Sequence, residues 1–290
     1  HGARVGTTVR LRGFTFSIIY EIEAESITMV VENETASPRV EVLEGDCRAL
    51  MAGLVSDGRK VDMILTDLPY GTTYAKWDEK LPMSDLWPLW ECLLAPGGAI
   101  VLTASQPFTS LLIVSRLAWF RCEWIWDKVH AANFPNANKQ PLKVHESVLV
   151  FAPAQTTYNP QKTLGSKNHV QGRSAQNVTE TRLLNIRTVD DLSGLKFPKS
   201  IQTFPKHSSQ CGLHPTQKPV DLFEYLIRTY SNPDAVVLDC CAGSGTTGEA
   251  ALLTGRSAIL MENDPGYYQT ILARLRDFRR ATSPSRSSAK

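Results

Sequence analysis

The segment Asp67-Leu68-Pro69-Tyr70 combines residue types that could act on a planar aromatic amine. The nitrogen of such an amine is a poor nucleophile because its lone pair is delocalised into the ring. The carboxylate of Asp67 and the backbone carbonyl of Leu68 could accept both amino protons and favour a more tetrahedral nitrogen. Tyr70 could stack on the ring, while Pro69 would keep the turn rigid. The segment therefore predicts a site where an exocyclic amino nitrogen attacks an electrophile in line, without a covalent intermediate.

A second segment, Gly243-Ser244-Gly245-Thr246-Thr247-Gly248, has the spacing of a loop that binds a nucleotide-containing cofactor. Glycines let the chain turn sharply and let a ligand approach the backbone, and the helix that follows presents free N–H groups. Glu262, nineteen residues after Gly243, could accept hydrogen bonds from ribose hydroxyls. The pattern predicts an adenosine-containing cofactor, but it does not distinguish a dinucleotide from S-adenosylmethionine.

Both segments directly follow apolar stretches that are typical of buried strands, Val61–Leu65 and Ala235–Asp239. Strands and helices alternate along the chain, which predicts an α/β fold with a mostly parallel sheet covered by helices on both faces. Ligands of such sheets lie at the carboxyl ends of the strands, so we expect both segments at one edge. Further strands are expected at Ala99–Thr103, Trp124–Trp126, Ser147–Phe151 and Ser257–Met261. Helices are expected at Ser84–Leu94 and Val220–Tyr230, a third helix should end at Thr254, and a fourth should begin at Pro265. A turn is expected at Pro96-Gly97-Gly98.

Residues 154–212 have a different composition, with little apolar periodicity and many Gln, Ser, Asn and Thr residues. The segment holds eight basic and three acidic side chains, a net charge of +5, although the whole chain has a net charge of only +2. Basic side chains can hold the phosphates of nucleic acid while a few other side chains read base edges. A solvated loop is the alternative interpretation of this segment.

Composition sets broad limits on the class of protein. The chain has 290 residues, of which 42% are hydrophobic and 21% charged, as in ordinary globular proteins. Its six cysteines form no C-x-x-C pair, so no metal site is expected, and the adjacent Cys240 and Cys241 are interpreted as small core residues. Free thiols and the lack of a signal peptide favour the cytoplasm, and no apolar run is long enough for a membrane span.

Taken together, the motifs resemble those of the β-class, permuted S-adenosylmethionine-dependent DNA amino-methyltransferases, in which a D-P-P-Y motif precedes a target-recognition region and the cofactor loop follows. The resemblance covers residues 40–275. Glu44-Gly45-Asp46-Cys47 is similar to the entry segment of the family, and His214-Pro215-Thr216-Gln217-Lys218-Pro219 to its H-P-T-x-K-P segment. Asp239–Thr247 is similar to the cofactor loop, and Met261–Asp264 contains the ribose-binding acid. Trp126-Asp127-Lys128 and His145-Glu146 also lie where the family has similar residues.

The resemblance implies a Rossmann-like methyltransferase sheet with an inserted target-recognition region. It divides the chain into an N-terminal extension or added segment (1–38), a catalytic half (39–153), the target-recognition insertion (154–213), a cofactor-binding half (214–279) and a disordered tail (280–290). The implied catalytic residues are Asp67, Leu68, Pro69 and Tyr70. The implied cofactor-binding residues are Asp46, Cys47, Asp67, His214, Thr216, Lys218, Asp239, Cys241, Ala242, Gly243, Ser244, Gly245, Thr246, Thr247, Glu262 and Asn263.

The implied activity is methylation of N6 of an adenine flipped out of duplex DNA, with S-adenosyl-L-methionine as the cofactor. Asp67 at the head of the motif favours adenine, because cytosine-N4 enzymes of the family usually carry serine there. Two departures from the family pattern are Leu68 in place of proline and Cys240-Cys241 in place of proline and phenylalanine. The resemblance also leaves open a homodimer and a restriction endonuclease partner.

Several alternatives stay open at this point. A cytosine-N4 methyltransferase would use the same chemistry, and an RNA or protein-amide methyltransferase would suit any planar amine. A catalytically silent DNA-binding relative would account for the substituted motif residues. A dinucleotide-dependent oxidoreductase would use the glycine loop and Glu262 but would leave Asp67–Tyr70 and the basic segment unexplained.

Overall fold

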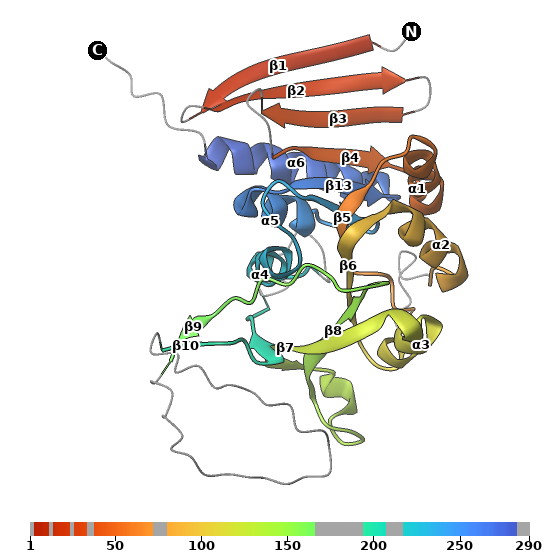
Figure 1. The fold of residues 1–290 in the computed structure, drawn as a ribbon, viewed down its shortest axis with the longest axis vertical. Coiled ribbons are helices and arrows are strands. Elements are labelled where there is room, and N and C mark those ends of the chain that lie inside the picture. The colour runs from red at the N-terminus through yellow and green to blue at the C-terminus, as the bar shows by residue number, and fades with distance from the viewer. Residues whose placement is uncertain are drawn as a thin grey trace. The chain divides into compact units, whose positions relative to one another are not determined.

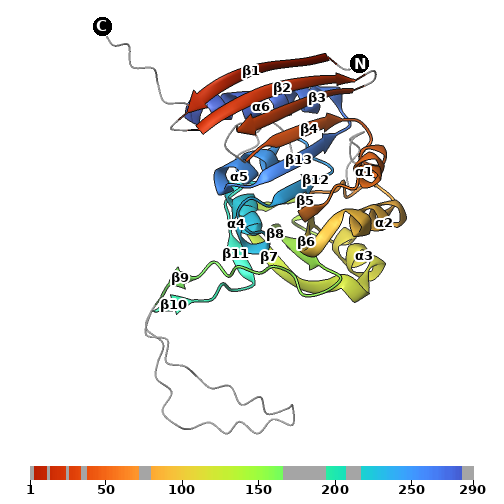
Figure 2. The ribbon, with the colours of Figure 1, turned by 45° about the horizontal axis from the view of Figure 1, so that its top comes forward.

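A computed structural model describes residues 3–11, 14–23, 26–33, 38–71, 80–165, 194–206 and 217–282 of the chain. The chain divides into a main unit, residues 1–159 with 200–290, and a small unit, residues 160–199. Among the described residues, the main unit contains a sheet of eleven strands in the order β1-β2-β3-β4-β13-β12-β5-β6-β8-β7-β11 (Figure 1 and Figure 2). These strands are β1 Ala3–Leu11, β2 Phe14–Glu23, β3 Ser26–Asn33, β4 Val40–Glu44, β5 Val61–Thr66, β6 Leu94–Ala104, β7 Phe120–Ala132, β8 Lys143–Phe151, β11 Ile201–Thr203, β12 Val236–Asp239 and β13 Ser257–Glu262.

The middle of this sheet is parallel. Strands β4, β13, β12, β5 and β6 pair in parallel, whereas β8 joins β6 antiparallel and β7 joins β8 antiparallel. On the other side, β3, β2 and β1 extend the sheet as an antiparallel meander beyond β4. A parallel sheet needs long crossover connections, and here helices supply them.

Helices cover both faces of the parallel strands, as Figure 2 shows. Along β5, Met63 and Leu65 pack into the same core cluster as side chains of α4, α5 and α6, while Ile64 packs on the opposite face with side chains of α1, α2 and α3. This alternation explains why β5 is a nearly continuous apolar run. The helices are α1 Cys47–Ser56, α2 Met83–Leu93, α3 Phe108–Ser115, α4 Val220–Tyr230, α5 Thr246–Thr254 and α6 Pro265–Thr282, with 3-10 turns at Leu117–Trp119 and Phe134–Asn136.

The predicted α/β fold is confirmed, and the strands and helices expected from the sequence all occur. Three of the strands are longer than predicted, at Leu94–Ala104, Phe120–Ala132 and Lys143–Phe151. One local expectation was wrong. No turn separates helix and strand at Pro96-Gly97-Gly98, because β6 already begins at Leu94 and passes through these residues with a shift of register against β5. A bulge lets a strand accommodate proline and glycine without ending.

The N-terminal segment was expected to hold only weak alternation, yet it forms three strands of the sheet. At the other end, α6 continues to Thr282, into the region expected to be a tail. Among the described residues, the structure contains no helix that is both long and apolar enough to cross a membrane.

The small unit lies inside the segment that was expected to be the target-recognition insertion. Its described residues form a short antiparallel ladder of β9 (Thr163–Leu164) with β10 (Leu195–Lys196). The ammonium group of Lys162 lies 4.3 Å from the centre of the Phe197 ring, a cation–π contact that joins the two sides of this ladder.

Candidate active site

The segment Asp67–Tyr70 and the glycine loop meet at the point in the sheet where the crossover connections change direction. Strands β12 and β5 are neighbours, and from them the chain crosses over in opposite directions, from β12 to β13 and from β5 to β6. Asp239 ends β12 and Asp67 follows β5, so both carboxylates lie at the carboxyl edge of the sheet. Such a switch point is the place where open α/β sheets bind ligands. Here it opens into a cavity of about 730 Å³, within the usual range for ligand pockets.

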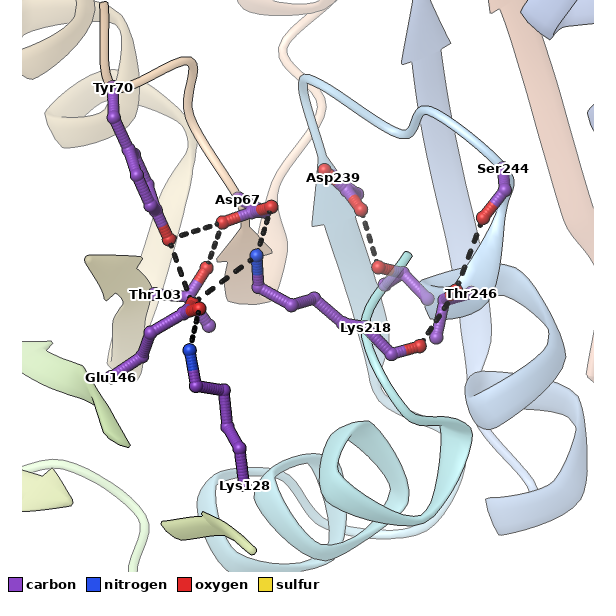
Figure 3. A network of polar contacts seen from close by, with 10 residues as sticks. Asp67, Tyr70, Thr103, Lys128, Glu146, Lys218, Asp239, Ser244 and Thr246 are labelled. Carbon is purple, nitrogen blue, oxygen red and sulfur yellow. Dashed lines mark hydrogen bonds and ion pairs between the residues drawn. The ribbon is translucent and has the colours of Figure 1, made fainter. Parts of the chain in front are cut away.

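Asp67 is held by hydrogen bonds from three different parts of the chain (Figure 3). Its Oδ1 accepts a hydrogen bond from the Tyr70 hydroxyl at 2.8 Å and another from the hydroxyl of Thr103 in β6. Its Oδ2 accepts a hydrogen bond from Nζ of Lys218 at 2.5 Å. A carboxylate offers about four lone pairs. The donors in the described part of the chain therefore use three of them, and one position on Oδ2 is left over.

Lys218 continues into a chain of alternating charges. Its Nζ lies 3.6 Å from Oε2 of Glu146 in β8, and Oε1 of Glu146 lies 3.1 Å from Nζ of Lys128 in β7. Both lysine side chains are buried. Buried charges of this kind persist only when each has a partner, so the four groups form one interdependent network.

The pKa values in this network follow from burial and from the neighbouring charges. Burial alone would lower the pKa of Lys218, but the carboxylates of Asp67 and Glu146 outweigh it and raise that pKa above its usual value. Burial alone would raise the pKa of Glu146, but Lys218 and Lys128 lower it. Burial of the Tyr70 hydroxyl, with Asp67 and Glu146 nearby, raises its pKa well above the usual range. Lys218 and Glu146 are therefore charged at neutral pH, while the Tyr70 phenol is neutral.

The ring of Tyr70 lies beside this network. Its hydroxyl is fixed on Asp67, and its ring packs at 5.5 Å, tilted by 34°, against Phe108 of α3. Because both ends of the side chain are held, the ring has a defined orientation beside Asp67. A planar ligand could stack on it without first having to order the side chain.

The glycine loop lies across the switch point and is fixed by two carboxylates. Gly243 has a φ of +53°, and its N–H donates to Oε2 of Glu262 at 2.8 Å. Asp239 accepts hydrogen bonds from the backbone N–H of Cys241 at 3.1 Å and from the Thr247 hydroxyl. Burial raises the pKa of Asp239 to about 6, although these donors act in the opposite direction. These hydrogen bonds fix the conformation of the loop that leads into α5.

The entry segment completes the cavity on the side of β4. Asp46 caps α1 by accepting a hydrogen bond from the N–H of Arg48 at 2.8 Å, and it forms an ion pair with the Arg48 side chain at 2.6 Å. Hydrogen bonds from that side chain lower the pKa of Asp46 to about 2. Asp46 therefore presents a charged acceptor to the cavity, which it lines together with Cys47.

Comparisons with known proteins agree with this geometry. Residues 61–273 match the family model described as DNA methylase, which covers well over half of the chain. The chain belongs to this family. It is 26% identical to the DNA adenine methyltransferase YhdJ of Escherichia coli (strain K12) over 251 residues, 81% of this chain and 82% of that protein. It is 27% identical to the type II methyltransferase M.HpaI of Haemophilus parainfluenzae over 240 residues, 74% of this chain and 68% of that protein.

Among solved structures, the M1.HpyAVI–SAM complex shares the fold. It superposes with a TM-score of 0.57 at 24% identity, over 81% of this chain and 99% of that chain. The resemblance to DNA amino-methyltransferases that the motifs indicated is confirmed by the family match. The matched residues begin at β5 and end within α6, so the N-terminal meander lies outside them.

Most of the residues that the resemblance implied line this one cavity. They are Asp46, Cys47, Asp67, Leu68, Pro69, Tyr70, Lys218, Asp239, Cys241, Ala242, Gly243, Ser244, Thr246, Thr247, Glu262 and Asn263. Gly245 is not among the lining residues; it caps α5 instead, with a φ of +76°. His214 and Thr216 lie outside the described residues.

Lys218 was expected to bind the cofactor, and this role stays a prediction. Its ammonium group points to Asp67 and Glu146. Its backbone carbonyl faces the glycine loop, where it accepts a hydrogen bond from Thr246 at 3.4 Å. Three other members of the network, Thr103, Lys128 and Glu146, had no predicted role. The last two belong to Trp126-Asp127-Lys128 and His145-Glu146, short segments that also resemble the family, and this was the signal available in the sequence.

Proposed function

We propose that this protein transfers a methyl group from S-adenosylmethionine to N6 of an adenine flipped out of duplex DNA. One observation supports this most strongly: the Asp67 carboxylate and the glycine loop face one cavity from adjacent strands. A methyl donor and an acceptor amine held in that cavity would be side by side. Positioning of this kind supplies a large part of the rate in a bimolecular transfer.

The residues of the cavity fit this cofactor. S-adenosylmethionine supplies an electrophilic methyl group on a sulfonium sulfur. Glu262 has both oxygens on backbone N–H groups, of Gly243 and Asp264, which fixes a carboxylate where ribose hydroxyls can donate to it. Gly243, at positive φ, allows close approach to the backbone. The start of α5 adds backbone N–H groups for a carboxylate.

Asp67 and Leu68 would hold the amine. The remaining lone pair of Asp67 Oδ2 and the Leu68 carbonyl accept the two amino protons, while Tyr70 stacks on the base. The amino nitrogen then forms a bond to the methyl carbon, the carbon–sulfur bond breaks with its electrons going to sulfur, and the nitrogen loses one proton to Asp67 or water. Leu68 in place of the family proline keeps the carbonyl that this step needs.

Adenine is the base that the site favours. The family resemblance associates an aspartate at this position with adenine, and YhdJ, named as a DNA adenine methyltransferase, is a relative over most of its length. Adenine in a duplex is stacked and paired, so it must be flipped out to reach Asp67. The basic segment 154–212 would hold the phosphates around it.

Further parts of the proposal concern partners and location. The type II name of M.HpaI suggests a restriction endonuclease of matching specificity, and the family resemblance suggests a homodimer. The cytoplasm, with its DNA and its reducing conditions, suits the free cysteines of the described chain.

The test is methyl transfer from labelled S-adenosylmethionine to unmethylated DNA, followed by nucleoside analysis. We expect N6-methyladenine from the wild type and none from Asp67→Ala, which should still bind the cofactor. Asp62→Asn is the matched control, because Asp62 lies on the same strand but is exposed, near the opposite end. N4-methylcytosine would contradict the base assignment. Cofactor binding with no product on any DNA would overturn the proposed substrate.

A further inference from the structure

Three cysteine side chains gather on the wall of the cofactor cavity. Cys47 is the first residue of α1, and Cys240 and Cys241 follow β12. Their sulfur atoms all lie within 4.8 Å of one another. Cys47 and Cys240 are buried, Cys241 is half-buried, and all three line the cavity. We call this group the thiol cluster.

The fold creates this cluster from distant parts of the sequence. Cys47 follows β4 and the cysteine pair follows β12, and the two strands are separated in the sheet by β13 alone. The sequence contains no C-x-x-C spacing, so local spacing gave no sign of it. Replacement of the family's proline and phenylalanine by Cys240 and Cys241 supplies two of the three sulfurs. The methyl transfer proposed above uses none of these thiol groups.

Three sulfurs at this separation match the preference of soft metal ions. Zinc bound to thiolates has Zn–S distances of about 2.3 Å and a tetrahedral arrangement, which places the sulfurs about 3.8 Å apart. Sulfurs already within 4.8 Å of one another need to move by about 1 Å or less to reach that geometry. Small rotations of cysteine side chains suffice for this. Because all three residues line the cavity, the fourth position of the tetrahedron would be open to water.

We propose that Cys47, Cys240 and Cys241 form a binding site for a thiophilic d10 metal ion such as Zn²⁺, and that the bound ion excludes the cofactor from the cavity. The first part stands on the geometry of the cluster. The second part rests on the proposed function, since it requires that S-adenosylmethionine occupies this cavity. Binding would release the thiol protons to solvent.

The site itself is tested by titrating the reduced, metal-free protein with Cd²⁺ and following thiolate-to-metal charge-transfer absorption, without cofactor. We expect one Cd²⁺ per chain, displaced by Zn²⁺, and at least tenfold weaker binding in Cys47→Ala and in Cys241→Ala. Cys92→Ala is the control, because Cys92 is an exposed cysteine outside the cluster, and it should bind as the wild type does. Wild-type absorption that survives in both cluster variants would overturn the site, as would wild-type protein that binds no Cd²⁺.

The second part is tested by measuring S-adenosylmethionine binding with and without one equivalent of Zn²⁺. We expect the apparent affinity of the wild type to fall at least tenfold with Zn²⁺ and to be restored by a chelator, while Cys241→Ala should be insensitive. Equal affinity with and without Zn²⁺ would overturn the exclusion. The titration without Zn²⁺ serves as a separate check, because failure to bind the cofactor there would count against the proposed function and not against the thiol cluster.

Discussion

The arrangement around Asp67 depends on Glu146, a residue for which the sequence predicted no role. It separates two buried lysines, and it shares Lys218 with Asp67. Without its charge, Lys218 would be balanced by Asp67 alone and would bind more tightly to the oxygen that is proposed to accept an amino proton. Glu146 is therefore a positioning residue, and its effect should appear in turnover more than in cofactor binding.

We expect Glu146→Gln to lower kcat by about tenfold, which corresponds to about 1.4 kcal/mol in the activation free energy. Affinity for S-adenosylmethionine should stay within about twofold, because the cofactor loop is fixed by Asp239 and Glu262 instead. Steady-state kinetics and equilibrium binding of the cofactor measure the two effects separately. Glu123→Gln is the matched control, since Glu123 is an exposed carboxylate on the same pair of strands. Equal kcat in the two variants would contradict the positioning role.

The same residue gives a prediction for the pH dependence of stability. The neighbouring lysines make the pKa of Glu146 lower in the folded chain than its ordinary value of 4.5. A carboxyl group of this kind stabilises the fold above its unfolded pKa, and that contribution disappears as the pH falls through its folded pKa. The difference in unfolding free energy between wild type and Glu146→Gln should therefore shrink below about pH 4.5. Denaturant unfolding between neutral and acidic pH would show this, and a constant difference would argue against it.

Sequence patterns predicted which residues form the site, but they did not predict where each side chain points. Asp67 and Tyr70 were predicted from the chemistry of a short segment, and the structure brings them together on one edge. Lys218 was expected to face the cofactor because its segment resembles one that contacts the cofactor. The direction of its side chain is decided by two carboxylates, Asp67 after β5 and Glu146 in β8, both more than seventy positions away in the sequence. Interactions over such separations have no local periodicity from which they could be predicted.

At the scale of elements, helix α5 shows how backbone conformation positions the site. Gly245 precedes the helix with a φ of +76°, and Gly255 follows it with a φ of +75°. An added Cβ at Gly245 would lie 3.1 Å from Cγ2 of Ile271, a buried side chain of α6, whereas an added Cβ at Gly255 would meet nothing within 4 Å. The two glycines thus share the same backbone conformation and differ only in their surroundings.

This pair supports a matched experiment on stability. Gly255→Ala should cost about 1 kcal/mol of unfolding free energy from left-handed strain alone. Gly245→Ala should cost about 2–3 kcal/mol, because the contact with Ile271 adds to the same strain. It should also weaken cofactor binding, since the start of α5 would shift. Chemical denaturation and cofactor titration of both variants test this, and equal losses would show that the contact does not matter.

The elements themselves were predictable where their periodicity is strong. β5, β12, β13 and α4 lie within one or two residues of their expected bounds, because each is a compact apolar or amphipathic stretch with clear ends. The meander β1–β3 was missed because its alternation is weak. The extension of β6 through Pro96-Gly97-Gly98 was missed because these residue types normally end an element, and only pairing with β5 keeps them in the strand.

At the scale of the whole molecule, the order of the sheet brings together the two motifs that the sequence separates. β5 and β12 are neighbours although the segment between them contains the most basic part of the chain. The shared edge of the two motifs could be expected from the alternation of strands and helices, but the pairing of β5 with β12 could not, since partners in a sheet are chosen by long-range packing. Domain boundaries at residues 154 and 213 stay predictions.

The basic segment provides the last prediction, which concerns DNA binding. If it holds phosphates, each lysine that contacts one should contribute about 0.9 to the slope of log affinity against log salt concentration. Lys196→Gln with Lys199→Gln, both in the small unit, should therefore reduce that slope by about 2 and weaken DNA binding, with cofactor affinity unchanged. The control is Lys60→Gln with Arg280→Gln, since Lys60 precedes β5 at the opposite edge of the sheet and Arg280 lies near the end of α6. DNA titrations at several salt concentrations compare the two double variants. Equal slopes in both would mean that the phosphates are held elsewhere, whereas a selective loss in the first would locate DNA binding in the small unit.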